Sequence, residues 1–425
     1  MRKSFVNLFY AFPAFSFAIP TFPVMILLPT FYSEKFGLEI SFIGIVLFLA
    51  RLIDIITDPI MGWISDKNII TRKFWLIFGG ILAILALNKL FLIDSIPYKN
   101  YLLIWISILY IGWTMFQIPY LSLGYDLELD YFARTKLSAM REFFILLGLF
   151  ISLGLPLFLE MKSFESLEFL VKVASISGIT GIIILLIFVP DNLKKKKKID
   201  TFKIFSNLKK NLRFKQFMSI FFINSLANVL PMLLFSFFIT DVIGGNDFER
   251  QKILFVYFLS ALVGIPFWTK FSKFLSKKNT WSISLISAAF FFSFVLFIDH
   301  GDIFAFIIIS CLTGFCLGAD LIIPPSIQAD ITDYHKLKFK EDISGVTFSS
   351  ITFLNKFSFA LGSIFVFGIL GLLNFQTNTQ INFSSKVFLF FSYAFLPIIL
   401  KVFCYFLLKK FKSSRDDLLE IQKKL

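Results

Sequence analysis

Three ionisable residues lie within a long apolar stretch between residues 40 and 64, and their spacing points to cation chemistry. Arg51, Asp54 and Asp58 stand at i, i+3 and i+7, so they project from one face of a helix. An ionisable group within a membrane costs roughly 3 kcal/mol or more, and such groups therefore tend to face a cavity and mark an ion or substrate path. Two carboxylates one helical turn apart offer hard oxygen ligands, which suit Na⁺ or a shared proton. We therefore expect Asp54 and Asp58 to bind a coupling cation.

The same residues also allow a purely structural interpretation. Arg51 and Asp54 could form an internal salt bridge that only fixes the packing of the helix. Pro59 favours the cation site, because proline cannot donate to the carbonyl of Ile55 and leaves that oxygen available. The sequence leaves both interpretations open.

The composition of the chain identifies the elements that must position these residues. The chain has 425 residues, 57% of them hydrophobic, and its mean hydropathy is +0.79. Soluble domains do not have this composition, so we expect an all-α polytopic protein of the lipid bilayer. Twelve segments are long and apolar enough to span it: residues 5–31, 40–64, 74–94, 101–125, 141–159, 170–190, 216–240, 251–270, 280–299, 303–325, 345–371 and 386–409.

A lysine-rich segment separates six of these spans from the other six. Residues 191–215 include five consecutive lysines, Lys194 to Lys198. Basic loops collect on the cytoplasmic side, which predicts a multi-pass protein of the plasma (inner) membrane with both termini in the cytoplasm. The predicted parts are a six-helix bundle over 1–190, a basic linker over 191–215, a second six-helix bundle over 216–411 and a cytoplasmic tail over 412–425. Secondary transporters built from structural repeats have this organisation and bind substrate near the membrane midplane.

The span over 101–125 carries polar and aromatic candidates for substrate contact. Thr114 and Gln117 stand at i and i+3, and Trp113 and Tyr120 add aromatic faces. Such a set suits a hydroxyl-bearing ligand with an apolar side. Small polar residues also pack helices in membranes, so the structural alternative stays open.

Two further charges are expected near the middle of the membrane. Asp320 lies in the span over 303–325, and Lys356 lies at a comparable depth in the span over 345–371. A buried ammonium and a buried carboxylate in one half of the protein tend to pair, directly or across a ligand. The two residues are therefore either substrate contacts or a structural ion pair between these two spans.

The sequence lacks the motifs of several other function classes. There is no Gly-rich phosphate loop, so we expect no ATP-driven transport and no enzyme activity. His300 and His335 are not paired with cysteines, so no metal site is expected beyond a coupling Na⁺ at Asp54 and Asp58. The formal charge of +14 follows from basic cytoplasmic loops, which argues against a nucleic-acid partner. The expected partners are a small-molecule substrate and the bilayer, with no obligatory protein partner and no cofactor other than Na⁺ or H⁺ as coupling ion.

Two sequence strings resemble known transporter motifs. The string Gly62-Trp-Ile-Ser-Asp66-Lys67, followed by Arg72-Lys73, resembles the loop between helices two and three of the major facilitator superfamily. The longer string over 51–62, with its Asp-x-x-x-Asp-Pro core, resembles the glycoside–pentoside–hexuronide:cation symporter family. Further matches to that family are residues 118–123, 134–141, 329–334 and Lys356.

This resemblance implies a major facilitator fold of twelve transmembrane helices in two six-helix bundles. It implies that Asp54 and Asp58 bind the coupling cation, with Thr114 near that site and Lys356 close by. It also implies cytoplasmic gating by the loop around Asp66 and by Arg141. The candidate gating residues are Arg51, Gly62, Asp66, Lys67 and Arg141.

The chain departs from this family at the substrate site. The melibiose permease, a member of the family, has sugar-binding aspartates where this chain has Ser16 and Gln117. We therefore expect a cation-coupled symporter that moves a sugar, glycoside or uronate by alternating access. The alternatives are a transporter of an amphiphile such as a lysolipid, and a non-transporting membrane sensor, which the short charged segment after Lys409 disfavours.

Overall fold

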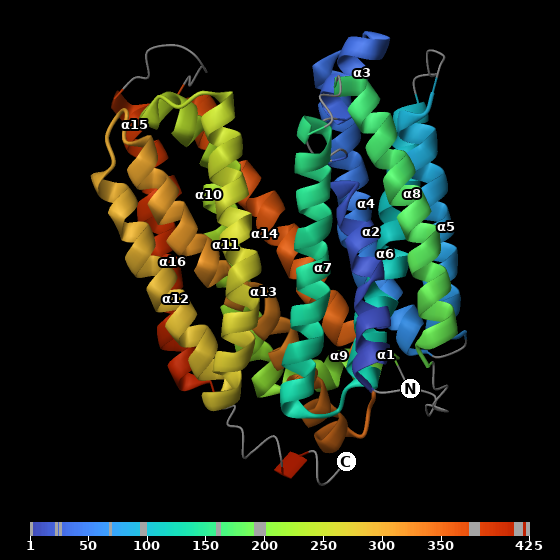
Figure 1. The fold of residues 1–425 in the computed structure, drawn as a ribbon. Helices are drawn as coiled ribbons and strands as arrows, with labels where there is room; N and C mark the ends of the chain where they lie inside the picture. Colours follow the sequence, from blue (N-terminus) through green and yellow to red (C-terminus); the bar gives the residue numbers. More distant parts are fainter. Residues whose placement is uncertain are drawn as a thin grey trace. The chain divides into compact units, whose positions relative to one another are not determined.

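The chain is described by a computed structural model over residues 3–21, 24, 28–67, 70–93, 100–158, 163–190, 201–373, 383–411 and 420–421 (Figure 1). Over these residues the secondary structure is helical and contains no strand. Each of the twelve predicted spans coincides with one helix or with a set of consecutive helices, which confirms the all-α membrane fold. The lysine run over 194–198 and most of the predicted tail lie outside the described residues.

The chain forms two compact units. Unit 1 comprises residues 1–201 and 341–350, and unit 2 comprises residues 202–340 and 351–425. The helices of unit 1 are α1 (Lys3–Ala11), α2 (Pro13–Ala18), α3 (Leu28–Phe36), α4 (Ile40–Asp66), α5 (Arg72–Phe91), α6 (Tyr101–Leu127), α7 (Tyr131–Phe158) and α8 (Ser163–Phe188). Unit 2 contains α9 (Thr201–Lys210) from its second residue onward, α10 (Leu212–Phe237), the π-helix η2 (Phe238–Ile243), α11 (Asp247–Phe274), α12 (Lys277–Ser293), the 3₁₀ helix η3 (Phe294–Phe297), α13 (Ile303–Phe339), α15 (Phe383–Phe390), the π-helix η4 (Phe391–Phe395) and α16 (Leu396–Lys410). Helix α14 (Ser344–Leu372) begins in unit 1 and continues in unit 2.

Most of these helices have the length and composition of membrane spans. About 20 apolar residues are enough to cross a bilayer. Nine helical segments among the described residues are long and apolar enough to do so. Helix α4 is 27 residues long and carries the charged face predicted for span 40–64. The chain is therefore a multi-pass membrane protein.

Two helices run well beyond their predicted spans. Helix α7 begins at Tyr131 and α13 continues to Phe339, although the predicted spans begin at residue 141 and end at residue 325. The extension of α13 buries polar residues such as Asp330 and Asp333, which are 1% and 3% exposed. A hydropathy profile ends a span where polar residues begin, so it misses helical turns that bury polar groups inside the protein.

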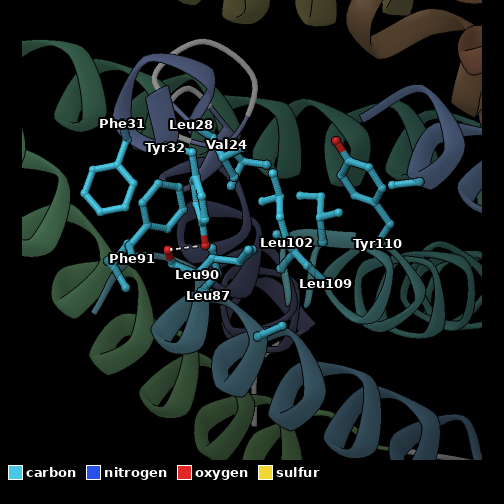
Figure 2. Packing of buried hydrophobic residues seen from close by; sticks show 14 of the residues in the cluster. Val24, Leu28, Phe31, Tyr32, Leu87, Leu90, Phe91, Leu102, Leu109 and Tyr110 are labelled. Atoms are coloured by element: carbon cyan, nitrogen blue, oxygen red, sulfur yellow. Dashed lines mark hydrogen bonds between the residues drawn. The ribbon is translucent and has the colours of Figure 1, made fainter. Parts of the chain in front are cut away.

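A hydrophobic core fixes α3 against α5 and α6 in unit 1. Figure 2 shows Phe31 and Tyr32 of α3 packed beside Leu90 and Phe91 of α5. The Tyr32 hydroxyl donates a hydrogen bond to the Leu90 carbonyl at 2.9 Å, which satisfies its polar group inside the core. Residues of α6, among them Tyr110, complete the same cluster.

The backbones of α5 and α6 approach each other closely at Gly79 and Gly112. A Cβ atom at Gly79 would lie 2.7 Å from the backbone nitrogen of Phe116, and one at Gly112 would lie 2.8 Å from the nitrogen of Ala83. Glycine is required at both positions, because a side chain would push the helices apart. Helix α4 packs on α6 in turn, so the close α5–α6 crossing sets which face of α6 meets the charged face of α4.

Candidate functional site

The two aspartates of α4 converge on a single hydroxyl of α6. Asp54 and Asp58 are 3% and 0% exposed. The Thr114 Oγ1 atom lies 3.3 Å from Asp54 Oδ1 and 2.9 Å from Asp58 Oδ1. One hydroxyl proton can serve only one of these carboxylates at a time, so the three oxygens form a compact acceptor-rich group. Such a group can share a proton or provide part of the oxygen shell of Na⁺.

The guanidinium of Arg51 borders this group of oxygens. Arg51 Nη1 lies 3.1 Å from Asp54 Oδ2, and the guanidinium carbon lies 4.7 Å from the centre of the Tyr110 ring. The ring face attracts the cation and holds it beside Asp54. The salt bridge expected as the structural alternative is therefore present, and it uses the Asp54 oxygen that does not contact Thr114. Sequence reasoning missed Tyr110, which lies one helical turn before Thr114 on α6.

The hydroxyl of Thr114 can be tested by two conservative substitutions. Thr114→Val keeps the shape of the side chain but removes the group that both carboxylates contact. A hydrogen bond to a charged group contributes about 1.5–3 kcal/mol, so we expect the cation midpoint to rise about tenfold or more. Thr114→Ser keeps the hydroxyl and should stay within about threefold of the wild type. The measurement is the midpoint of cation-dependent thermal stabilisation; equal midpoints for the two variants would contradict a cation role for Thr114.

The predicted substrate residues of unit 1 fall into two groups. Tyr120 is 4% exposed, and its hydroxyl donates to the Tyr10 carbonyl at 2.6 Å while the two rings stack at 4.5 Å. Tyr120 therefore packs against Tyr10, and its contact with substrate stays a prediction. Ser16 is 6% exposed, and its hydroxyl has no hydrogen-bond partner among the described residues. Gln117 is half-buried, and no side-chain hydrogen bond joins it to the described part of the chain.

Trp113 lies among other aromatic side chains. Its ring centre is 5.5 Å from that of Phe17 on α2 and 5.8 Å from that of Tyr110. Trp113 is half-buried, so part of its surface is open to contact. Unit 1 thus combines an aromatic face with the unsatisfied hydroxyl of Ser16. Substrate contact by Ser16, Trp113 and Gln117 stays a prediction.

The predicted gating loop brings Asp66 to the first turn of α14. Asp66 Oδ1 accepts a hydrogen bond from the Gly345 N–H at 2.8 Å, and Oδ2 accepts one from the Val346 N–H at 2.7 Å. These N–H groups have no partner within the helix, and a carboxylate also complements the positive end of the helix dipole. Asp66 is therefore an N-cap supplied by a residue far away in the sequence.

Glycines permit this approach of α4 and α14. A Cβ atom at Gly62 would lie 2.3 Å from Ser349 Oγ, and one at Gly345 would lie 2.4 Å from the Gly62 carbonyl oxygen. Lys67 takes a different position, with its Nζ atom 3.4 Å from the centre of the Trp63 ring. Gly62 and Asp66 thus belong to one set of contacts around the start of α14. We call this set, formed by Gly62, Asp66, Arg72, Ser344 and Gly345, the α4–α14 latch.

Arg72 is a latch residue that was quoted in the sequence motif but not assigned to the site. It is 3% exposed and donates to the Ser122 carbonyl at 2.5 Å, to the Asp126 carboxylate and to Ser344 Oγ at 2.7 Å. Arg141, which was predicted to act with this loop, has Glu142 as its ion-pair partner at 2.7 Å. The structure therefore joins Arg72 to the latch, and gating by Arg141 stays a prediction.

The ion pair between Asp320 and Lys356, one of the two alternatives that the sequence left open, does not form among the described residues. Asp320 pairs with Lys401 of α16 at 3.6 Å. Lys401 lies among apolar residues in the predicted span 386–409. This charge within a span was the signal by which the sequence could have identified a partner for Asp320. Helix α16 packs against α10 and α12, which brings Lys401 to the Asp320 side of the bundle. Lys356 lies on the part of α14 in unit 2, and its expected proximity to Asp54 and Asp58 stays a prediction.

The helices have the fold of the major facilitator class of membrane transporters. The E. coli fucose:proton symporter FucP superposes with a TM-score of 0.70 at 11% identity, over 97% of this chain and 98% of that one. A bacterial homologue of the iron transporter ferroportin, in its outward-facing state, gives a TM-score of 0.73 at 10% identity over 97% and 99%. At these identities the likeness concerns the fold alone.

The chain belongs to the MFS/sugar transport protein family, which matches residues 9–415. It is 24% identical to the sodium-dependent lysophosphatidylcholine symporter 1 of Gallus gallus, over 76% of this chain and 70% of the relative. It is 25% identical to the uncharacterized symporter YnaJ of Bacillus subtilis, over 79% and 75%. A shorter match, 31% identical over 28% and 27%, joins it to the inner membrane symporter YicJ of Escherichia coli.

Proposed function

We propose that this protein is a cation-coupled secondary symporter of the plasma membrane, with the coupling ion bound by Asp54 and Asp58. The observation that carries this proposal is the approach of one oxygen from each aspartate to Thr114 Oγ1, within 3.3 Å. Buried carboxylates that face a common hydroxyl form a site whose occupancy depends on cation or proton concentration. The names of its relatives, several of which are symporters and some sodium-dependent, support the same function.

Coupling follows from linkage between cation and substrate. A cation drives transport only if it changes the free-energy difference between inward- and outward-facing states for the substrate-bound and empty protein. Asp54 is suited to this role, because it belongs to the site and also holds Arg51 beside Tyr110. A change of charge at Asp54 would therefore also change its ion pair with Arg51, which lies on the same face of the helix.

The substrate we propose is a sugar, glycoside or uronate. Ser16 supplies a hydroxyl that the described protein leaves without a partner, Gln117 supplies an amide, and Trp113 supplies an aromatic face. Hydrogen-bonding groups beside an aromatic ring suit a ligand with hydroxyls and an apolar side. The family description as sugar transport protein supports this class.

A lysolipid is the second candidate, and a specific comparison favours it. The relative from Gallus gallus is named a lysophosphatidylcholine symporter. The sugar-binding aspartates of the melibiose permease are replaced here by the uncharged Ser16 and Gln117, which removes charge that a lipid chain would avoid.

Thermal stability and uptake into vesicles distinguish these substrates. Purified protein is heated with melibiose, glucuronate or lysophosphatidylcholine, in Na⁺ and in K⁺ and at several pH values. A ligand at about 100 times its Kd stabilises the folded state by about 2.7 kcal/mol, which raises the unfolding temperature measurably. We expect one substrate class to act and its effect to be strengthened by Na⁺ or by low pH. Absence of any cation effect, together with uptake that ignores Na⁺ and pH gradients, would contradict symport.

A further inference from the structure

Unit 2 contains a buried polar cluster that the proposed cation site does not use. At its centre the Asp320 carboxylate accepts hydrogen bonds from Asn224 Nδ2 at 2.9 and 3.0 Å, from Asn228 Nδ2 at 2.8 Å and from Trp281 Nε1 at 2.6 Å. Lys401 Nζ lies 3.6 Å from Asp320 Oδ2. These residues come from four helices, α10, α12, α13 and α16, and we call them the Asp320 hub.

The hydrogen bonds of the hub form a closed set. Lys401 Nζ also donates to Asn228 Oδ1 at 2.8 Å and approaches Asn224 Oδ1 at 3.3 Å, so its three protons face three acceptors. Both oxygens of Asp320 face at least two donors. Protein donors engage both oxygens of this carboxylate, so it offers little to a ligand. The hub therefore favours the structural alternative for Asp320 over substrate contact.

Helix α10 connects the hub to α14, because it carries hub residues on one face and a hydrogen bond to α14 on the next. Asn224 and Asn228 stand at i and i+4, so the hub holds one face of α10. On the neighbouring face, Ser225 Oγ donates to Asn355 Oδ1 at 3.0 Å. The next residue of α14 is Lys356, the residue that the family resemblance links to the cation site. A rotation of α10 that breaks the Ser225 contact would therefore release the turn of α14 that carries Lys356.

We propose that Asp320 and Lys401 are a matched charge pair that positions α10 and, through Ser225 and Asn355, the turn of α14 that carries Lys356. The two charges act as positioning residues and do not contact the coupling cation or the substrate. Only the role given to Lys356 rests on the proposed function. Removing one charge leaves the other buried and unpaired, whereas removing both restores neutrality, so single and double variants should behave differently.

The test compares Asp320→Asn, Lys401→Gln and the double variant by cysteine cross-linking. Ser225→Cys with Asn355→Cys, joined by a short bifunctional thiol reagent, reports the distance between α10 and α14 at the place where the Ser225 and Asn355 side chains meet. The native cysteines are first replaced by alanine: Cys311, Cys316 and Cys404. The control is Ser260→Cys with Cys311 retained, because Ser260 Oγ lies 3.0 Å from Cys311 Sγ at an α11–α13 contact outside the hub.

We expect each single variant to slow the α10–α14 cross-link about tenfold while the α11–α13 control is unchanged, and the double variant to recover to within about threefold. Unchanged cross-linking in both single variants would overturn the proposal, and so would a double variant as slow as the single ones. If the single variants fail to fold, a folded double variant supports the matched pair and an unfolded one contradicts it.

A second measurement separates this proposal from the proposed function. In protein with its native cysteines, the Na⁺ concentration that gives half of the full thermal stabilisation should rise about tenfold in the single variants. In the double variant it should return toward the wild-type value. A wild-type protein whose stability ignores both Na⁺ and pH would contradict the cation site. The cross-linking series would still decide whether the hub positions α14.

Discussion

Asp58→Asn is expected to abolish cation-driven uptake and to remove the stabilisation that the coupling cation gives. Asparagine has nearly the same shape but lacks the charge that a cation or proton would neutralise. At a cation concentration of about 100 times the wild-type Kd, the lost stabilisation is about 2.7 kcal/mol. The variant should still fold, because the substitution leaves the Arg51–Asp54 ion pair in place. The measurements are uptake into vesicles under a Na⁺ or pH gradient and the unfolding temperature with and without the cation.

The control for Asp58→Asn is Asp299→Asn, which makes the same chemical change at an exposed residue outside the site. It should leave uptake within about twofold of the wild type, since exposed surface substitutions have small effects. The double variant Asp54→Asn/Asp58→Asn tests the whole site. Full gradient-driven uptake in that variant would disprove the assignment of the cation site to these two residues.

Gly62→Ala is expected to reduce uptake strongly by forcing α4 and α14 apart at the latch. The added Cβ would lie 2.3 Å from Ser349 Oγ and 2.7 Å from the Gly345 carbonyl oxygen, both too close for contact. Overpacking of this kind costs about 1–3 kcal/mol, and here it would also pull Asp66 from the Gly345 and Val346 N–H groups that it caps. We expect initial uptake to fall about tenfold or more, measured at equal amounts of protein in the membrane.

The same helix supplies the control for Gly62→Ala. A Cβ atom at Gly44 of α4 would meet nothing within 4 Å, so Gly44→Ala changes helix propensity equally but adds no clash. Ser349→Gly in the Gly62→Ala background removes two of the three nearest atoms and should restore part of the loss. Equal uptake by Gly62→Ala and Gly44→Ala would show that close approach at the latch is not needed.

The buried charges of the two units are arranged in different ways. In the Asp320 hub, donors and acceptors match, and the ammonium and carboxylate balance within one unit. At Asp54 and Asp58, two carboxylates share one threonine hydroxyl, and one of them also holds an arginine that is 24% exposed. A closed set of hydrogen bonds stabilises one conformation, whereas two carboxylates beside one hydroxyl offer the oxygen ligands that a cation prefers. These arrangements are consistent with the positioning role proposed for the hub and the cation role proposed for the α4 site.

Local properties of the sequence were enough to predict the helices and part of the site. Hydropathy over about 20 residues locates a membrane span, and helical periodicity places Asp54 and Asp58 on one face of α4, because both depend only on neighbours along the chain. The family resemblance implied that Thr114 lies near Asp54 and Asp58 and that the loop around Asp66 acts in gating. The long extensions of α7 and α13 were missed, since hydropathy does not detect helical turns that bury polar side chains.

The partners of the charged residues were decided by the tertiary structure. Asp320 pairs with Lys401 rather than Lys356, Arg72 donates to Ser344 at the latch, and Tyr110 holds Arg51. Each of these contacts joins residues on different helices, and its formation depends on which helix faces meet. Those faces are set by glycine contacts such as Gly79 with α6 and Gly62 with the start of α14. The sequence alone therefore determined which residues carry charge in the membrane, and only helix packing decided which partner each charge meets, because that choice depends on distances across the bundle and not along the chain.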